Sequence, residues 1–250
     1  MLRVRGMTTL IVATRNLHKV REIEAILGPT YRFHSSNEFP GLPEVAEDAA
    51  TFAGNATKKA VAVADWLRAG MCLPGGPIPL PMDQKSPVYV LADDSGLEVD
   101  ALRGQPGIHS ARFAALEKRD SDVPRDEANN RKLLGLLAEV PLEKRTARFR
   151  CVIALVPMPP ARERFSASPC SVDGTELQVE LFEGVCEGKI RLEPAGAAGF
   201  GYDPLFVPEG FRQSFAEMED RKKNTLSHRF KALMNLRDHF GRSQDMSTCF

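Results

Sequence analysis

A short apolar run leads directly into two adjacent carboxylates. The β-branched and apolar residues Val88–Ala92 predict a buried strand, Asp93 and Asp94 follow, and Ser95-Gly96 is typical of the turn that ends such a strand. Unpaired charge there is costly, but a hard cation between the carboxylates would remove the cost, and Mg²⁺ favours one or two carboxylates plus substrate phosphates. An exposed Asp pair that caps a turn explains the same residues.

Composition and charge exclude some classes of protein. The chain has 250 residues, 43% apolar and 26% charged, which is typical of a soluble globular protein of one large or two small domains. Lys plus Arg equals Asp plus Glu at 33 each, so no overall basic field indicates a nucleic-acid partner. An anionic ligand would need a local cluster of basic residues.

Cysteine usage and the N-terminal sequence predict the compartment. The five cysteines are scattered without a CxxC pair, so they indicate neither a disulfide framework nor a zinc site and favour a reducing compartment. The apolar stretch Thr9–Ala13 is too short for a secretory signal or a membrane span. We therefore expect a cytoplasmic protein with no membrane partner.

Strand and helix patterns alternate along the chain, which predicts an α/β fold with a mixed sheet. Residues 1–7 are expected to form an extension, 8–240 a single domain with a proline-rich surface loop over 73–87, and 241–250 a polar tail. The expected strands cover residues 10–13, 31–35, 88–92, 147–153 and 176–182, and the expected helices cover residues 17–27, 51–67, 125–139 and 227–240.

The turn between the first strand and the first helix is a candidate anion site. Amide groups and the positive end of the helix dipole favour an anion there. Thr14 and Asn16 would add side-chain hydrogen bonds, and Lys19 a formal charge. The turn has neither a Walker nor a dinucleotide-binding pattern. Asn16 as a plain helix N-cap explains the local sequence equally well.

Two later segments offer aromatic and basic side chains. In Gly199–Phe206, glycines allow close backbone approach, and Phe200 and Tyr202 would provide stacking surfaces for a nucleobase; a turn with core aromatics is the alternative. In Lys223–Arg229, Lys, His and Arg gather where the last helix begins, and Ser227 can cap that helix. A solvated basic face would account for the remaining charges.

Together these segments resemble the inosine triphosphate pyrophosphatase family over residues 8 to 240. The motifs occur in one order, which makes coincidence an unsatisfactory explanation. They are Ala-Thr-x-Asn-x-x-Lys at 13–19, Thr-Phe-x-x-Asn-Ala at 51–56, Asp-Asp-Ser-Gly-Leu-x-Val-Asp at 93–100, Pro-Gly-Ile-x-Ser-Ala-Arg at 106–112, Glu-Pro-Ala-Gly at 193–196, Phe-Gly-Tyr-Asp-Pro at 200–204 and Ser-His-Arg at 227–229.

The resemblance implies hydrolysis of ITP, dITP and XTP to the monophosphate and pyrophosphate. It also implies a Mg²⁺-dependent homodimer with a small-molecule nucleoside triphosphate substrate. The implied fold is α/β and two-lobed, with a central twisted mixed sheet flanked by helices and the active site in a cleft between the lobes. Removing such nucleotides from the pool would keep them out of DNA and RNA.

The resemblance also assigns roles to individual residues. Asp94 is implied to activate the attacking water, with Lys19 stabilising charge. The implied metal-side carboxylates are Glu47, Asp93 and Asp94. The implied substrate contacts are Thr14, Arg15, Asn16, Leu17, His18, Lys19, Lys59, Ser95, Phe200, Gly201, Tyr202, Asp203, Lys223, His228 and Arg229.

Three departures from the family pattern bear on these roles. Gly54 stands where many members carry Glu, so one acidic group near the metal is missing. Arg15 occupies a position where a small residue is common, and it could add a phosphate contact or crowd the turn. The proline-rich loop 73–87 is an insertion ahead of the Asp pair.

Two alternative functions use the same residues. One is a nucleotide-sensing module that binds but does not hydrolyse, although binding alone would not need a water-activating carboxylate. The other is a pyrophosphatase of the same fold that acts on modified pyrimidine or methylated nucleotides. Pyrophosphate release from those nucleotides, but not from ITP, would distinguish the second alternative.

Overall fold

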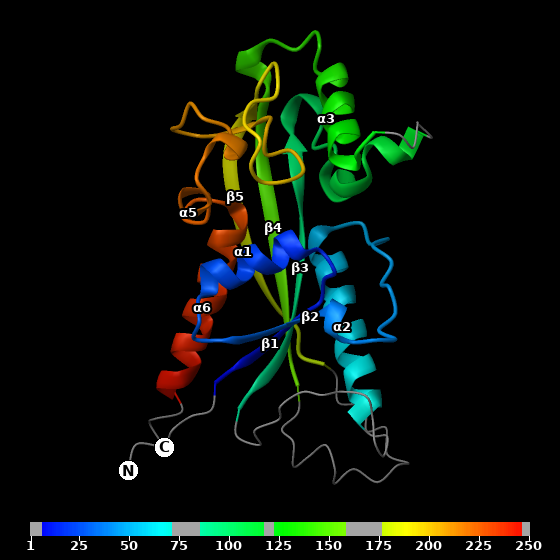
Figure 1. Ribbon diagram of the computed structural model, residues 1–250, viewed down its shortest axis with the longest axis vertical. Helices are drawn as coiled ribbons and strands as arrows, with labels where there is room; N and C mark the ends of the chain where they lie inside the picture. The colour runs from blue at the N-terminus through cyan, green and yellow to red at the C-terminus, as the bar shows by residue number, and fades with distance from the viewer. Residues whose placement is uncertain (1–6, 72–85, 118–122, 159–176, 247–250) are drawn as a thin grey trace. The chain divides into compact units, whose positions relative to one another are not determined.

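The structure is a computed structural model that describes residues 7–71, 86–117, 123–158 and 177–246. Its strands form one mixed six-stranded sheet in the order β2-β1-β3-β4-β5-β6, with β3 and β4 side by side at the centre (Figure 1). Pairing of β1 with β2 and with β3 is parallel, whereas β5 and β6 are antiparallel. The strands are β1 (Thr9–Val12), β2 (Arg32–Ser35), β3 (Val88–Val99), β4 (Thr146–Pro157), β5 (Glu180–Ile190) and β6 (Phe206–Pro208).

Helices separate most of these strands in sequence, which confirms the expected α/β class. The chain divides into two compact units, one formed by residues up to Asp94 together with 153–182, the other by Ser95–Val152 together with the chain from Glu183 onward. We call them unit 1 and unit 2. The helices are α1 (Leu17–Leu27), α2 (Phe52–Met71), α3 (Arg125–Leu136), α5 (Asp220–Lys223) and α6 (His228–Met246).

In unit 1, the order of the strands explains the apolar character of β1. Because β1 pairs on both sides, Leu10, Ile11 and Val12 are completely buried and form a continuous hydrophobic run. Helix α1 buries Val20, Ile23 and Leu27, as its spacing predicts. It ends at Gly28, whose φ of 74° lies in the left-handed region that favours glycine.

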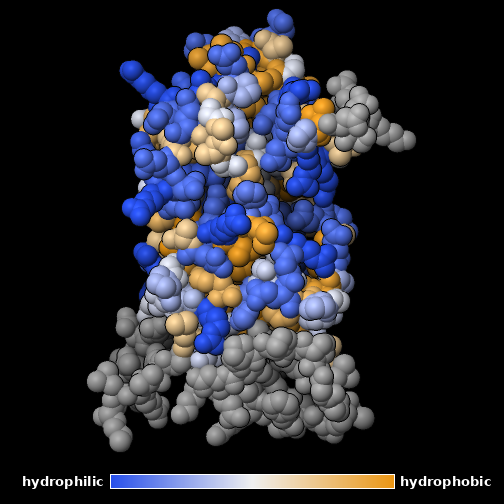
Figure 2. Space-filling view, viewed as in Figure 1, coloured by the Kyte–Doolittle hydropathy of each residue, from blue (hydrophilic) through white to orange (hydrophobic). Residues whose placement is uncertain are grey.

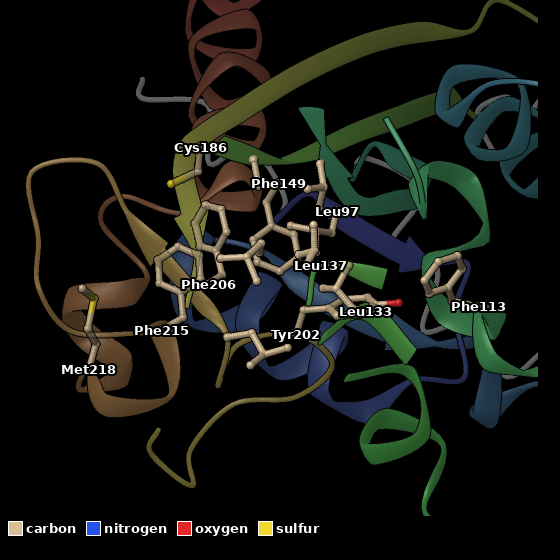
Figure 3. Close-up of a cluster of buried hydrophobic side chains, with 14 residues drawn as sticks. Leu97, Phe113, Leu133, Leu137, Phe149, Cys186, Tyr202, Phe206, Phe215 and Met218 are labelled. Carbon is tan, nitrogen blue, oxygen red and sulfur yellow. The ribbon is translucent and has the colours of Figure 1, made fainter. Parts of the chain in front are cut away.

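Unit 2 has its own hydrophobic core, shown in Figure 3. Phe149 on β4 lies at its centre, with its ring centroid 4.7 Å from that of Phe206 and 5.9 Å from that of Phe215. Leu133 from α3 and Leu137, which follows that helix, are also completely buried in this core. The core therefore joins β4 to α3 and to the segment after β5, which carries the candidate base-binding residues Phe200 to Asp203.

Strand β3 corrects the predicted end of the central strand. It does not stop at Ala92 but continues through Ser95-Gly96 to Val99. The parallel neighbour β1 is the strand that ends here: its last residue, Val12, pairs with Leu91 of β3. Sheet pairing outweighs the local turn preference of Ser-Gly. The Asp pair therefore lies within a strand, just beyond the point where β1 ends.

Other element boundaries also differ from the prediction. The strand expected at 176–182 is β5, which begins at Glu180 and runs to Ile190, and β6 was not predicted because it has only three residues. Helix α6 continues beyond Phe240 to Met246, since one interior glycine costs only about 1 kcal/mol. Residues 1–6 of the expected extension 1–7, most of the proline-rich loop 73–87 and residues 247–250 of the expected tail lie outside the described residues.

The visible face in Figure 2 is mostly hydrophilic, with small apolar areas between the polar residues. No helix in the described ranges is both long and apolar enough to cross a membrane. The large hydrophobic residues that are exposed are spread along the chain: Met7, Leu17, Leu136, Leu142, Leu181, Leu192 and Phe211.

Candidate active site

The turn after β1 is built by its own side chains. Asn16 Oδ1 accepts hydrogen bonds from the backbone N–H groups of His18 at 2.9 Å and Lys19 at 3.4 Å, which confirms its role as the N-cap of α1. Thr14 Oγ1 accepts from the N–H of Asn16 at 3.2 Å. The side chain of Leu17 is exposed, and the backbone N–H of His18 donates to the cap. The turn is therefore ordered by local hydrogen bonds.

Arg15 fastens this turn to a neighbouring loop. Its Nη2 donates to the carbonyl oxygen of Leu42 at 2.6 Å, and Asn37 Nδ2 donates to the carbonyl oxygen of Arg15 at 3.3 Å. The phosphate contact or crowding expected of Arg15 stays a prediction. The guanidinium group links the turn to the segment that continues toward Glu47.

Lys19 projects from the first turn of α1 toward β3. Its ammonium group forms an ion pair with Asp93 Oδ1 and lies 3.5 Å from the carbonyl oxygen of Asp93. The Asp93 side chain is completely buried, whereas Lys19 retains 15% exposure. Lys19 is thus held in position by a buried carboxylate while its side chain stays partly exposed.

Lys59 from α2 is the centre of a second charged group. Its Nζ lies 2.9 Å from Glu47 Oε1, 3.1 Å from Asp94 Oδ1 and 2.7 Å from the carbonyl oxygen of Asp93. Burial lowers the pKa of Lys59, but the neighbouring carboxylates of Asp94 and Glu47 outweigh this effect, so the pKa is raised overall. Lys59 is therefore a permanent buried cation that holds two carboxylates together.

Asp94 has an incompletely satisfied carboxylate. Burial raises its pKa more than the positive charges of Lys59 and Lys19 lower it. Its Oδ2 is buried and has no hydrogen-bond partner within the described part of the chain. A buried acceptor without a donor is costly, so this oxygen is suited to a cation or a water proton brought by a ligand.

The Asp pair does not enclose a cation between its side chains. Successive side chains of a strand point to opposite faces, and accordingly Asp93 pairs with Lys19 while Asp94 pairs with Lys59. The described residues contain no group of three or more His, Cys, Asp or Glu side chains placed to hold a metal. The donors that fit Mg²⁺ are the two oxygen ligands Asp94 and Glu47, with the remaining ligands left to water and phosphate, as this ion prefers.

Gly54 allows the segment that carries Glu47 to approach α2. A Cβ at position 54 would lie 2.8 Å from the Cβ of Ala49, closer than real Cβ contacts. The N–H of Ala49 donates to Asn55 Oδ1 at 2.9 Å. The close approach of Ala49 leaves no room for an acidic side chain at position 54. Asn55 was not among the predicted site residues, although it belongs to the motif Thr-Phe-x-x-Asn-Ala at 51–56.

In unit 2, Phe200 and Tyr202 have different environments. Tyr202 is buried in the hydrophobic core shown in Figure 3, where its hydroxyl donates to the carbonyl oxygen of Ser110 at 2.9 Å. Burial raises its pKa above the ordinary range. The prediction that Tyr202 stacks on a base is wrong, because its ring packs in the core. Phe200 is only partly buried and retains that possibility.

Basic side chains gather around Phe200. Lys223 Nζ lies 5.1 Å and the Arg229 guanidinium carbon 5.9 Å from the centre of the Phe200 ring. Asp203 Oδ2 accepts from Lys223 Nζ at 2.8 Å and from the N–H of Phe200 at 2.9 Å. Asp203 therefore fixes both the cation and the backbone of the aromatic residue.

The basic segment 223–229 is not a solvated face. Arg229 is 1% exposed, and its Nη2 donates to Ser95 Oγ at 3.0 Å. The His228 ring is buried and stacks on Phe149 with 4.7 Å between centroids and 14° between planes. Ser227 Oγ accepts from the N–H of Phe230 at 3.2 Å, which confirms its cap role. Burial keeps these polar side chains in defined positions.

The predicted site residues thus form two groups, each within one unit. Unit 1 brings together the turn Thr14–Asn16 and the charged residues Lys19, Glu47, Lys59, Asp93 and Asp94. Unit 2 brings together Ser95, Phe200, Asp203, Lys223 and Arg229. The first group is suited to phosphate and metal chemistry, the second to a planar ligand with hydrogen-bond acceptors.

Comparisons with known proteins show the family to which the chain is similar. The sequence model of the Ham1 family matches residues 10–239. The dITP/XTP pyrophosphatase of Desulforamulus reducens is 45% identical over 225 residues, covering 90% of this chain and 91% of the relative. That of Geobacter sulfurreducens is 43% identical over 236 residues, covering 94% and 98%.

Solved structures are also similar to this chain. The Ham1 protein of Staphylococcus aureus has a TM-score of 0.67 and 30% identity, with coverage of 95% of this chain and 100% of that protein. A nucleoside-triphosphatase, also named dITP/XTP pyrophosphatase, from Mycobacterium abscessus has a TM-score of 0.62 and 33% identity, covering 92% and 98%.

Proposed function

The chain belongs to the Ham1 family, and we propose that it is a nucleoside triphosphate pyrophosphatase. Its substrates are dITP, ITP, XTP and dXTP, which it hydrolyses to the monophosphate and pyrophosphate. The names of its relatives support the substrate class. The observation that carries the proposal is Asp94, a buried carboxylate with one oxygen on Lys59 and the other without a partner in the described residues.

Lys19 and Lys59 provide the positive charge that this reaction needs. Attack on a phosphorus atom in a polyanionic chain develops negative charge, and fixed cations stabilise it. Lys19 retains access to solvent while its ammonium group is held by Asp93. The N–H of Leu17, which Asn16 does not cap, together with the positive end of the helix dipole, would add a second phosphate contact.

Asp94 accepts the proton of the attacking water. Its raised pKa makes it a stronger base than an exposed aspartate. Asp94 and Glu47 would hold Mg²⁺, which neutralises phosphate charge when bound. In this proposal Asp93 is not a metal ligand, because its carboxylate holds Lys19. A sensor that only binds nucleotide would not need a carboxylate that accepts a proton from water.

Phe200, Arg229 and Lys223 recognise the base. Phe200 offers a partly exposed ring for stacking. Arg229 and Lys223 carry only N–H donors, which suit the 6-keto acceptor of hypoxanthine and xanthine and leave the 6-amino group of adenine unpaired. Such a mismatch costs about 1–3 kcal/mol, enough to exclude adenine by one or two orders of magnitude.

The test is pyrophosphate release from dITP, XTP, dGTP and dATP, measured with Mg²⁺ and with a chelator. We expect strong release from dITP and XTP that depends on Mg²⁺, with little from dATP. Guanine shares the 6-keto group, so release from dGTP measures what the site requires at the 2-position of the base. Release from dATP at the same rate would refute the base assignment. Absence of release from any purine nucleotide would favour the sensor or the pyrimidine pyrophosphatase.

We also propose a cytoplasmic homodimer, on the family resemblance of the sequence. The two described cysteines, Cys151 and Cys186, form no disulfide, which fits a reducing compartment. Light scattering coupled to gel filtration would measure the oligomeric state, and a mass near 27.6 kDa would contradict the dimer.

A further inference from the structure

Two side chains of helix α3 bind the backbone N–H and the carbonyl oxygen of Gly201. Asp126 Oδ2 accepts the N–H of Gly201 at 2.7 Å, and Asn130 Nδ2 donates to the carbonyl oxygen of Gly201 at 3.0 Å. The two side chains are four residues apart, so they lie on the same face of the helix. Neither residue belongs to the motifs from which the active site was inferred.

This contact acts on the backbone next to Phe200. Phe200 is flanked by Gly199 with φ of 75° and Gly201 with φ of 63°, and two glycines in the left-handed region leave the intervening residue few intrinsic restraints. Asp203 holds the N–H of Phe200. The peptide groups on the other side of Phe200 are held by Asp126 and Asn130. Together these contacts hold the backbone on both sides of Phe200, and so the point from which its ring projects.

A comparison within α3 indicates that Asn130 is not simply a packed core residue. Asn129 is 2% exposed and makes hydrogen bonds through both ends of its amide, to Ala114, Ser110 and Ala111. Asn130 is 9% exposed, yet its Oδ1 has no partner in the described residues. A buried amide with one unsatisfied end is costly for stability. The hydrogen bond that the Asn130 side chain makes in the described residues is to Gly201, next to Phe200.

We propose that Asp126 and Asn130 are positioning residues for base recognition. They set the ring of Phe200 against Lys223 and Arg229, so that a purine base is bound between a fixed aromatic face and fixed donors. This inference rests on the proposed function. It adds a second layer to the base site, made of residues that contact the loop and not the nucleotide.

The test compares Asn130→Ala with the matched control Asn129→Ala. Loss of one hydrogen bond that orients the loop should raise KM for dITP by about three- to tenfold in Asn130→Ala with little change in kcat. Asn129→Ala should lower the melting temperature at least as much but leave KM within about twofold. A lower melting temperature for Asn130→Ala with unchanged KM would show a merely structural role and overturn the inference.

A double-mutant cycle with Phe200→Ala examines the route of the effect. If Asn130 acts through Phe200, Asn130→Ala should raise KM no further once the ring is removed. Independent, multiplicative increases in KM would overturn the inference while leaving the pyrophosphatase intact. A wild-type enzyme without pyrophosphatase activity would refute the proposed function and this inference together, so the two failures are distinguishable.

Discussion

Lys59 and Asp94 form a buried ion pair in which only one carboxylate oxygen takes part. Lys59 Nζ lies 3.1 Å from Asp94 Oδ1, whereas Asp94 Oδ2 has no hydrogen-bond partner in the described residues. The pair therefore leaves a negatively charged oxygen available at a defined position. A protein selected only for stability would satisfy this atom, because an unpaired buried acceptor is costly.

Asp94→Asn should abolish turnover while dITP still binds. The amide keeps the size of the side chain but cannot accept the proton of the attacking water, and loss of a general base typically costs about 10²–10⁴-fold in kcat. Pyrophosphate release measures kcat, and calorimetry measures dITP binding. Asp48→Asn is the control, because Asp48 is an exposed residue of the same unit, paired with Lys58. Retained activity in Asp94→Asn would remove Asp94 from the mechanism.

The same substitution should change how stability depends on pH. Burial raises the pKa of Asp94 in the folded protein, so folding favours the protonated form and the ionised form destabilises the protein at neutral pH. Asp94→Asn should be more stable than wild type at pH 7. The difference should shrink as pH falls through the raised pKa and vanish below the ordinary value of about 3.9.

Urea unfolding at several pH values, in the presence of chelator, measures this effect. Asp48→Asn should show at most a small difference from wild type, because its exposed charge is solvated. A variant Asp94→Asn less stable than wild type at pH 7 would contradict the raised pKa of Asp94. It would mean that the attraction between Asp94 and Lys59 stabilises the ionised carboxylate more than burial destabilises it.

Lys19→Ala should lower kcat by about 10²-fold or more through loss of transition-state charge stabilisation. The variant should also be less stable, because removal of Lys19 breaks its ion pair with the completely buried Asp93. Steady-state kinetics and thermal unfolding separate the two effects. Lys58→Ala serves as control, since Lys58 is exposed on α2. A rate close to wild type would make Lys19 a structural residue.

Gly54→Ala should destabilise the protein and weaken its response to Mg²⁺. The new Cβ would lie 2.8 Å from that of Ala49, and overpacking of this kind costs about 1–3 kcal/mol. Displacement of Ala49 would carry Glu47 away from Lys59 and raise the Mg²⁺ concentration for half-maximal activity. Gly135→Ala on α3 is the control, because a Cβ there meets no atom within 4 Å. That variant should be as stable as wild type or more stable.

Phe200→Ala and Tyr202→Phe should separate a base contact from a core contact. Removal of a stacking ring should raise KM for dITP by about ten- to a hundredfold, since base stacking contributes about 1–3 kcal/mol. Tyr202→Phe removes only the hydrogen bond to Ser110 and should cost about 1 kcal/mol of stability without a change in KM. An increase in KM for Tyr202→Phe alone would restore Tyr202 to the base site.

Local features of this protein follow from the sequence by itself. The bounds of α1, its Asn16 cap and its end at Gly28 were all predictable, because each depends on hydrogen bonds between residues a few positions apart. The family motifs likewise identified Asp94, Lys19 and the Phe200 segment as chemically important.

Only the tertiary structure decided which way these residues face and what holds them. Continuation of β3 past Ser95-Gly96 separates Asp93 from Asp94, and packing in the core removes Tyr202 from the base site. The bond between Asn130 and Gly201 joins residues 71 positions apart, which no local pattern encodes. Side-chain direction depends on strand pairing and on packing between distant segments, and these are settled only when the whole chain folds.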